Sequence, residues 1–338
     1  KMTLVDPNLD WPYMMTLPTA SIMNEKAVTD DPEKGPAVGT GPWMVDSYEF
    51  GNYTKLVAFE DSWRGAPNAK SFTFRYIPED SARLIALQNG EIDICQTPAA
   101  IELGRIEEDP ALDLISYKGG SLTYMAFNTQ KDPAKDENLR KAVAHAIDID
   151  SIIAVAAEGR GEKATSFWGW DEFGFYDCGG YTRDLDKAKE YLAASGLNPA
   201  DCGFAIICSD DTKLRAGQVI QSSLKENLGI DVTLESMDLA TYLDKTAVGD
   251  YQAAIGGYTS SDVLAHSMGV YHSKSIDGSN KTRTNDPTID GLIDKLQATL
   301  DPEENVKIVT ELSKAVNENC PQIPLYLRNN VRAYAKGL

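Results

Sequence analysis

The sequence predicts an α/β fold in two domains, and three observations lead to this expectation. Residues 200–258 alternate strand, helix, strand, helix and strand, a pattern typical of a mostly parallel sheet covered by helices. A chain of 338 residues is longer than most single domains. The region 40–95 is richer in hairpin signals, and the composition changes near Lys118-Gly119-Gly120, which we take as a domain boundary.

The first half of the chain contains mainly extended segments. The run WMVDSYEF at 43–50 leads through Gly51-Asn52 into YTKLVAFE, and this is a turn signal between two β-prone runs. Pro78 ends the next strand, and Gly90 ends the first clear helix. The remaining elements predicted here are a helix at 81–90 and strands at 71–77, 91–95 and 121–129.

The second half of the chain predicts more helix. Two of its helices begin with proline, at Pro287 and Pro302, and proline is favoured in the first helical turn. Apolar residues recur three and four apart in the last helix, which indicates one buried face. Helices are predicted at 139–159, 185–196, 213–229, 287–300 and 302–319, and strands at 204–209, 230–235, 251–258 and 322–334.

Composition and charge exclude several functional classes. The formal net charge is −19, the opposite of the basic footprint that nucleic-acid binders show, and it disfavours binding to anionic membranes. No apolar run approaches the roughly 18 residues that a membrane-spanning helix requires. The opening KMTLVDPNLDW has no apolar signal-peptide region. We therefore expect no nucleic-acid partner and a solvated acidic surface.

No motif predicts catalysis, a cofactor or a metal. The stretch GTGP at 39–42 lacks the rest of a phosphate-binding loop, because an extended run and no helix follows Pro42. GxSxG and HExxH are both missing. His145 lies among alanines in a predicted helix, and His266 and His272 are six residues apart, so they do not share a helical face.

The five cysteines leave at least one thiol without a partner in the chain. Cys178 and Cys202 lie in loop-like stretches on either side of one predicted helix, and they are the best candidates for a disulfide in an oxidising compartment. Cys95 and Cys208 lie in apolar strand-like runs and are expected to be buried.

Two segments carry residues that suit a ligand site. The loop SFWGWDEFGF at 166–175 contains tryptophans that either anchor the loop in the core or line a cleft. The segment GGYTSSD at 256–262 follows a predicted strand, and α/β folds place ligands at the carboxyl ends of strands. Asp262 is either a carboxylate at that site or an exposed turn residue.

Several long motifs follow one another in a fixed order over nearly the whole chain. They are PAVGTGPWMV, FEDSWRGAPNAKSFTFRYIPEDSARLIALQNGEIDI, YMAFNTQ, LRKAVAHAIDIDSII, GYTRDLDKAKEYLAASGL, IQSSLKENLGIDVTL and CPQIPLYLRNNV. Together these motifs resemble family 5 of the solute-binding proteins of ABC importers, which includes oligopeptide-, dipeptide- and nickel-binding receptors.

The resemblance implies a type II periplasmic-binding-protein-like α/β fold with two lobes and a hinge. By analogy, residues 1–120 form the later part of lobe one, residues 121–329 form lobe two, and residues 330–338 form a return strand to lobe one. Members lie outside the cytoplasmic membrane, in the periplasm or as lipoproteins, and deliver a ligand to a permease without chemistry. In the family GTGP comes later in the chain, so we expect the N-terminal part of lobe one and a small extra domain to be absent. An exposed sheet edge would then favour self-association.

The family also suggests which residues meet a ligand. Peptide-binding members resemble a G-W-x-x-D pattern, and here Gly257 and Tyr258 match it, whereas Ser261 holds the usual Asp position and Asp262 comes one residue later. We expect the main chain of Gly257–Thr259 to pair with a short peptide and Asp262 to meet its amine.

Trp168 and Trp170 are expected to line the same cleft. An oligosaccharide or a metal chelate is the alternative ligand, and a secreted acidic hydrolase is the alternative class.

Overall fold

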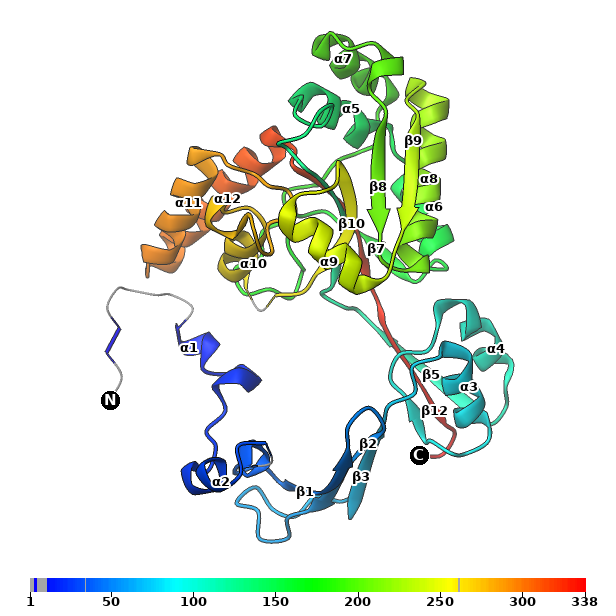
Figure 1. Ribbon diagram of the computed structural model, residues 1–338, viewed down its shortest axis with the longest axis vertical. Coiled ribbons are helices and arrows are strands. Elements are labelled where there is room, and N and C mark those ends of the chain that lie inside the picture. Colours follow the sequence, from blue (N-terminus) through cyan, green and yellow to red (C-terminus); the bar gives the residue numbers. More distant parts are fainter. Residues whose placement is uncertain (1–2, 5–10, 34, 261) are drawn as a thin grey trace. The chain divides into compact units, whose positions relative to one another are not determined.

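The computed structural model describes residues 3–4, 11–33, 35–260 and 262–338, and the chain divides into two compact units. The larger unit contains Tyr117–Asn330, and the smaller one contains Trp11–Ser116 together with Val331–Leu338. Each unit is described by itself (Figure 1). The lobe boundaries expected from the sequence stay a prediction about the whole protein.

The larger unit is built on a six-stranded sheet in the order β7-β11-β6-β10-β8-β9. Its central strands are apolar runs buried on both faces, as expected where helices cover a sheet on two sides. The strands are β6 (Leu122–Phe127), β7 (Gly161–Lys163), β8 (Phe204–Cys208), β9 (Val232–Ser236), β10 (Ala253–Tyr258) and β11 (Gln322–Arg328).

The expectation of a mostly parallel sheet is wrong for this unit. Strands β10, β8 and β9 are parallel neighbours, as the strand–helix alternation over 200–258 predicts. Strand β6, however, pairs antiparallel with both β10 and β11, and β11 pairs antiparallel with β7. The sheet is therefore mixed, because its other half is assembled from strands far apart in the sequence.

Helices cover this sheet, and α8 packs along β8 and β9 (Figure 1). The helices are α5 (Glu137–Ala146), α6 (Ile149–Ala156), α7 (Leu185–Ser195), α8 (Asp211–Leu228), α9 (Leu239–Val248), α10 (Val263–Val270), α11 (Pro287–Ala298) and α12 (Pro302–Asn319). No helix in the described part of the chain combines the length and the apolar character needed to cross a membrane.

Each helix from α5 to α12 begins after an aspartate whose side chain accepts a hydrogen bond from a main-chain N–H in the first turn. The capping residues are Asp136, Asp148, Asp184, Asp210, Asp238, Asp262, Asp286 and Asp301. Such a cap satisfies a donor that the helix itself leaves free and stabilises it by roughly 1 kcal/mol. Part of the chain's negative charge is therefore explained by aspartates that cap helices.

The smaller unit contains two three-stranded sheets, β1-β2-β3 and β4-β12-β5. Strand β12, near the C-terminus, lies between β4 and β5, and α3 contacts β4. The elements are α1 (Trp11–Met14), α2 (Glu25–Asp30), β1 (Trp43–Glu49), β2 (Tyr53–Ala58), β3 (Ser71–Arg75), α3 (Asp80–Gln88), β4 (Ile94–Cys95), α4 (Leu103–Glu108), β5 (Leu112–Tyr117) and β12 (Asn330–Ala335).

Candidate functional site

The end of strand β10 presents a main-chain edge without a strand partner. β6 pairs with β10 over its whole length, from Ala253 to Tyr258. β8 pairs with it only at Ala253 and Ala254. On the side facing away from β6, Gly256, Gly257 and Tyr258 therefore have no neighbouring strand among the described residues. The exposed Gly257 and Thr259 lie at this edge, as expected for a segment that accepts an added strand.

Tyr258 is held in place by its neighbours in the larger unit. Its ring packs on the His266 ring, with 4.6 Å between the ring centroids. Gly269 makes room for its hydroxyl, because a Cβ at that position would lie 2.4 Å from the hydroxyl oxygen. Burial raises the pKa of the Tyr258 phenol, and the nearby carboxylates of Glu172 and Asp262 add to the shift. The phenol thus stays neutral and can donate or accept a hydrogen bond.

Asp262 is a buried helix cap in the structure and not an exposed turn residue. Its Oδ1 accepts a hydrogen bond of 2.7 Å from the N–H of Ala265 in the first turn of α10. Its main chain forms a bridge with Phe173. The carboxylate expected to meet a peptide amine is therefore engaged by the protein itself. The neighbouring Ser261, which holds the usual Asp position of the family pattern, lies outside the described residues.

The two tryptophans of the loop 166–175 have different environments. Trp168 is fully buried in the core, and its Nε1 donates to Ser267 Oγ over 3.0 Å. The expectation that Trp168 lines a cleft is therefore wrong. Trp170 is 38% exposed, and its Nε1 donates to Gly119 O over 2.9 Å. Lys118 Nζ lies 5.0 Å from its ring centroid. Trp170 thus remains the tryptophan able to contact a ligand.

Two further residues lie beside Tyr258 that the sequence did not point to. Glu172 Oε1 lies 2.7 Å from His266 Nδ1 and also accepts from the N–H of Gly169 over 2.8 Å. Both side chains are fully buried. Glu172 and His266 are far apart in the chain, and no local pattern pairs them. In the sequence, His266 stands out only by its spacing of six residues from His272, which does not predict a metal site.

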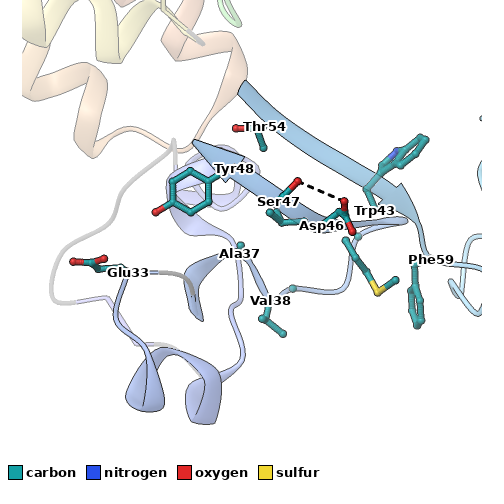
Figure 2. A pocket seen from close by; sticks show the side chains of 13 residues that line it. Glu33, Ala37, Val38, Trp43, Asp46, Ser47, Tyr48, Thr54 and Phe59 are labelled. Atoms are coloured by element: carbon teal, nitrogen blue, oxygen red, sulfur yellow. Dashed lines mark hydrogen bonds between the residues drawn. The ribbon is translucent and has the colours of Figure 1, made fainter. Parts of the chain in front are cut away.

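A groove of about 850 Å³ lies in the smaller unit, between β1 and the segment before it. Figure 2 shows Trp43, Tyr48 and Phe59 around it. Its charged lining side chains are Glu33 and Asp46, and Asp46 pairs with Lys55 over 2.9 Å.

Comparison with known proteins gives the family. The model for "Bacterial extracellular solute-binding proteins, family 5 Middle" matches residues 1–279. The chain belongs to this family. This confirms the resemblance drawn from the ordered motifs, and family 5 chains are described as extracellular binding proteins.

Curated relatives of this family 5 chain include receptors for different ligands. It is 26% identical to haem-binding protein A of Haemophilus influenzae, over 85% of this chain and 54% of that protein. It is 24% identical to the dipeptide-binding protein of Escherichia coli, over 95% of this chain and 61% of that protein. The chain thus spans less than two thirds of the length of these relatives.

Solved structures confirm the periplasmic-binding-protein fold of this family 5 chain. The periplasmic binding protein DppA of Helicobacter pylori, in complex with the peptide STSA, matches with a TM-score of 0.83 and 24% identity. That match covers 98% of this chain and 67% of DppA. NikA of Staphylococcus aureus, in complex with Ni(L-His)2, matches with a TM-score of 0.80 and 20% identity over 99% of this chain and 72% of NikA.

The cysteines of this family 5 chain are free thiols in the structure, so the expected disulfide between Cys178 and Cys202 is not formed. Cys178 Sγ lies 3.5 Å from Thr165 O, and Cys202 Sγ lies 3.2 Å from Asn198 O. Each thiol thus has a local main-chain acceptor on its own side of α7. The described residues contain no cluster of three or more His, Cys, Asp or Glu arranged to hold a metal ion.

Proposed function

We propose that the chain is the solute-binding part of an extracytoplasmic receptor, in the periplasm or anchored to the cell surface as a lipoprotein. It captures short peptides and delivers them to the permease of an ABC importer. The observation that carries this proposal is the main-chain edge at Gly257–Thr259, where Gly257 and Thr259 are exposed and β8 no longer pairs with β10. The family assignment supports the receptor role, and relatives that are dipeptide- and oligopeptide-binding proteins support the ligand class.

A peptide suits this edge because its main chain supplies alternating donors and acceptors. Pairing with a sheet edge recognises the main chain and needs no particular side chain from the ligand. The half-buried Tyr258 and the exposed ring of Trp170 then offer flat surfaces to ligand side chains. The ligand leaves unchanged, and the receptor performs no chemistry on it.

Titration calorimetry with Ala-Ala-Ala and with a pool of tri- and tetrapeptides tests the proposal. We expect saturable binding of peptides. A tripeptide methylated on its main-chain nitrogens should bind at least about 10-fold more weakly, because it cannot donate to the edge. Equal binding of the methylated and unmethylated peptides would contradict main-chain pairing. Mass spectrometry of the same mixtures should show no hydrolysed peptide, and turnover would instead support an acidic hydrolase.

A metal chelate, or an oligosaccharide stacked on Trp170, is the second ligand class. Solved relatives carry Ni(L-His)2 in one case and agropinic acid in another. The same calorimeter experiment therefore includes Ni(L-His)2 and a mixture of oligosaccharides. Tight binding of either one, without peptide binding, would replace the peptide in this proposal and leave the receptor role intact.

For the sheet β1-β2-β3 we propose a second copy of this chain as partner. Its strands leave Val45 and Phe74 exposed, and β1 and β3 have no strand beyond them among the described residues. Light scattering should show association that rises with protein concentration. Phe74→Lys should abolish it, whereas Phe50→Lys in the β1–β2 turn makes the same chemical change away from the strands and should not. Strictly monomeric protein at all concentrations would refute it.

A further inference from the structure

The buried contact between Glu172 and His266 joins the loop 166–175 to helix α10. Glu172 Oε1 accepts from Gly169 N within the loop, at 2.8 Å, and meets His266 Nδ1 in the second turn of α10, at 2.7 Å. Both side chains are fully enclosed. One carboxylate oxygen therefore fixes the turn of the loop and also fixes the loop against the helix.

The same helix makes two further contacts with the loop. The N–H of Val263 donates to Phe173 O over 3.0 Å, and Trp168 Nε1 donates to Ser267 Oγ. The His266 ring also packs against the ring of Tyr258 at the end of β10, with an angle of 38° between the ring planes. A chain of direct contacts thus runs from Glu172 through the imidazole of His266 to Tyr258.

The pair is poorly suited to stabilising the fold as such. Glu172 Oε2 and His266 Nε2 are buried and have no hydrogen-bond partner among the described residues. A buried ionisable pair with unsatisfied atoms contributes little net stability, and apolar side chains of similar size often replace such pairs without loss. Its orientation is nevertheless unambiguous, because only Oε1 is reached by both donors. A role in fixing geometry explains the pair better than a role in stability.

The carboxylate of Glu172 also affects the pKa of a neighbouring tyrosine. Burial raises the pKa of Tyr271, which lies one residue beyond the end of α10, and the Tyr124 phenol and the Glu172 carboxylate add to the shift. The His266 ring lies parallel to the Tyr271 ring, with 6.4 Å between the centroids. The imidazole therefore has two tyrosine rings and one carboxylate as neighbours.

We propose that Glu172 and His266 are positioning residues that hold Tyr258, and with it the open end of β10, in the geometry that receives the ligand. This inference rests on the proposed function, because it assigns the two residues a task at that same edge. Glu172 fixes the imidazole through its hydrogen bond, and the imidazole fixes the tyrosine through ring contact. Neither residue touches the ligand.

Four variants separate the hydrogen bond from the ring contact. Glu172→Gln keeps an oxygen that can accept from Gly169 and His266, whereas Glu172→Ala removes it. His266→Asn keeps an N–H donor near Nδ1 and loses the ring, whereas His266→Phe keeps a ring and loses the donor. Phe173→Ala is the matched control, because its side chain lies in the same loop and is 61% exposed.

Hydrogen exchange of the segments 166–175 and 255–259 is the first measurement, and it needs no ligand. We expect Glu172→Ala to speed exchange of both segments by about 10-fold or more, and Glu172→Gln to restore the wild-type rates within about 3-fold. His266→Phe should loosen the loop and spare β10, whereas His266→Asn should do the reverse. Strand β8 reports global stability, so the acceleration in the two segments should exceed any acceleration in β8 of the same variant.

Binding of Ala-Ala-Ala is the second measurement. We expect Glu172→Ala to lower the urea midpoint, because a buried side chain and its hydrogen bonds are lost, and to weaken binding about 10-fold under conditions in which the variant is still fully folded. Glu172→Gln should restore the affinity. Unchanged exchange in Glu172→Ala, or no rescue by Glu172→Gln, would overturn the inference. If Glu172→Ala does not fold, the exchange patterns of His266→Phe and His266→Asn test the inference in its place. If the wild type binds no peptide, the proposed function fails, and the exchange data still decide whether the pair positions Tyr258.

Discussion

The two units contain similar elements but bury them differently. In the larger unit, the central strands and the helices around them form one large apolar cluster, and two smaller buried clusters lie along the same sheet. In the smaller unit, the buried cluster is small and lies around α3, α4 and the sheet β4-β12-β5. In the fully described strands β1, β2 and β3, no side chain is buried. The same strand-forming residue types thus produce a closed core in one unit and open faces in the other.

The difference shows what strand sequences do and do not encode. Continuous apolar runs such as FAIIC in β8 are buried on both faces. The alternating run SFTFR in β3 predicts one covered face, yet Phe72 and Phe74 are exposed and contact each other at 4.7 Å between ring centroids. Alternation specifies which face of a strand is apolar, but not what covers it.

The largest expected effect on stability comes from comparing a side chain in the core of the larger unit with one on the exposed sheet β1-β2-β3. Leu312→Ala in α12 removes a fully buried side chain and should lower the free energy of unfolding by about 2–5 kcal/mol. At protein concentrations too low for the proposed self-association, Phe74→Ala in β3, where the ring is 46% exposed, should change it by only about 0.5 kcal/mol. Urea unfolding measures both. An equal loss in Phe74→Ala would mean that the face of β3 is covered in solution, and the self-association experiment would then identify the second copy as the cover.

A smaller effect is expected where Gly269 accommodates Tyr258. Gly269→Ala places a methyl group 2.4 Å from the Tyr258 hydroxyl oxygen, so the ring must move, at roughly 1–3 kcal/mol. Tyr258→Phe removes that oxygen and should recover part of the loss in the double variant. Urea unfolding of the two single variants and the double variant gives the coupling free energy. Additive losses would contradict a direct contact between these two positions.

Asp262 allows the capping role to be separated from a ligand role. Asp262→Ala removes the cap of α10 and should cost about 1 kcal/mol, whereas Asp262→Asn, also a good cap, should change stability by only a few tenths. We expect peptide affinity to be unchanged in Asp262→Asn, because the carboxylate already serves the helix. Calorimetry measures that affinity. A large loss of peptide affinity in Asp262→Asn, with stability preserved, would indicate that Asp262 does bind the peptide amine.

Much of the fold could be predicted from local signals. The strand–helix alternation over 200–258 appears as the parallel group β10-β8-β9, and Gly196 and Gly229 end helices in the left-handed conformation, as glycine permits. The antiparallel half of the sheet could not be predicted in this way. The pairing of β6 with β10 and β11 depends on contacts between residues far apart in the chain, and the strand patterns are compatible with either direction.

The site was predicted only in part, and the failures have one cause. The segment at 256–262 was identified because it follows a strand, and this signal is local. Trp168 and Trp170 are two residues apart in the same loop, yet Trp168 is buried and Trp170 is 38% exposed, and this difference depends on packing against residues far away in the chain. The pairing of Glu172 with His266 likewise comes from the tertiary fold alone. The local sequence identifies candidate residues for the site, but contacts between distant parts of the chain decide which of them are buried and which can meet a ligand.

The last prediction concerns the order in which the cysteine thiols react with a reagent. It compares the stability of the two cores without any substitution. Burial raises the pKa of Cys208 to about 12 and that of Cys320 to about 11, so at pH 8 almost none of either thiol is the reactive thiolate. Both lie in the larger core, whereas the buried Cys95 lies in the smaller one. In rising urea we therefore expect a thiol reagent to label Cys95 before Cys208 and Cys320. Labelling in the opposite order would contradict the contrast between the cores. In full denaturant without reductant, all five cysteines should react. If only three react, two are joined in a disulfide, and Cys178 and Cys202 would again be the candidates.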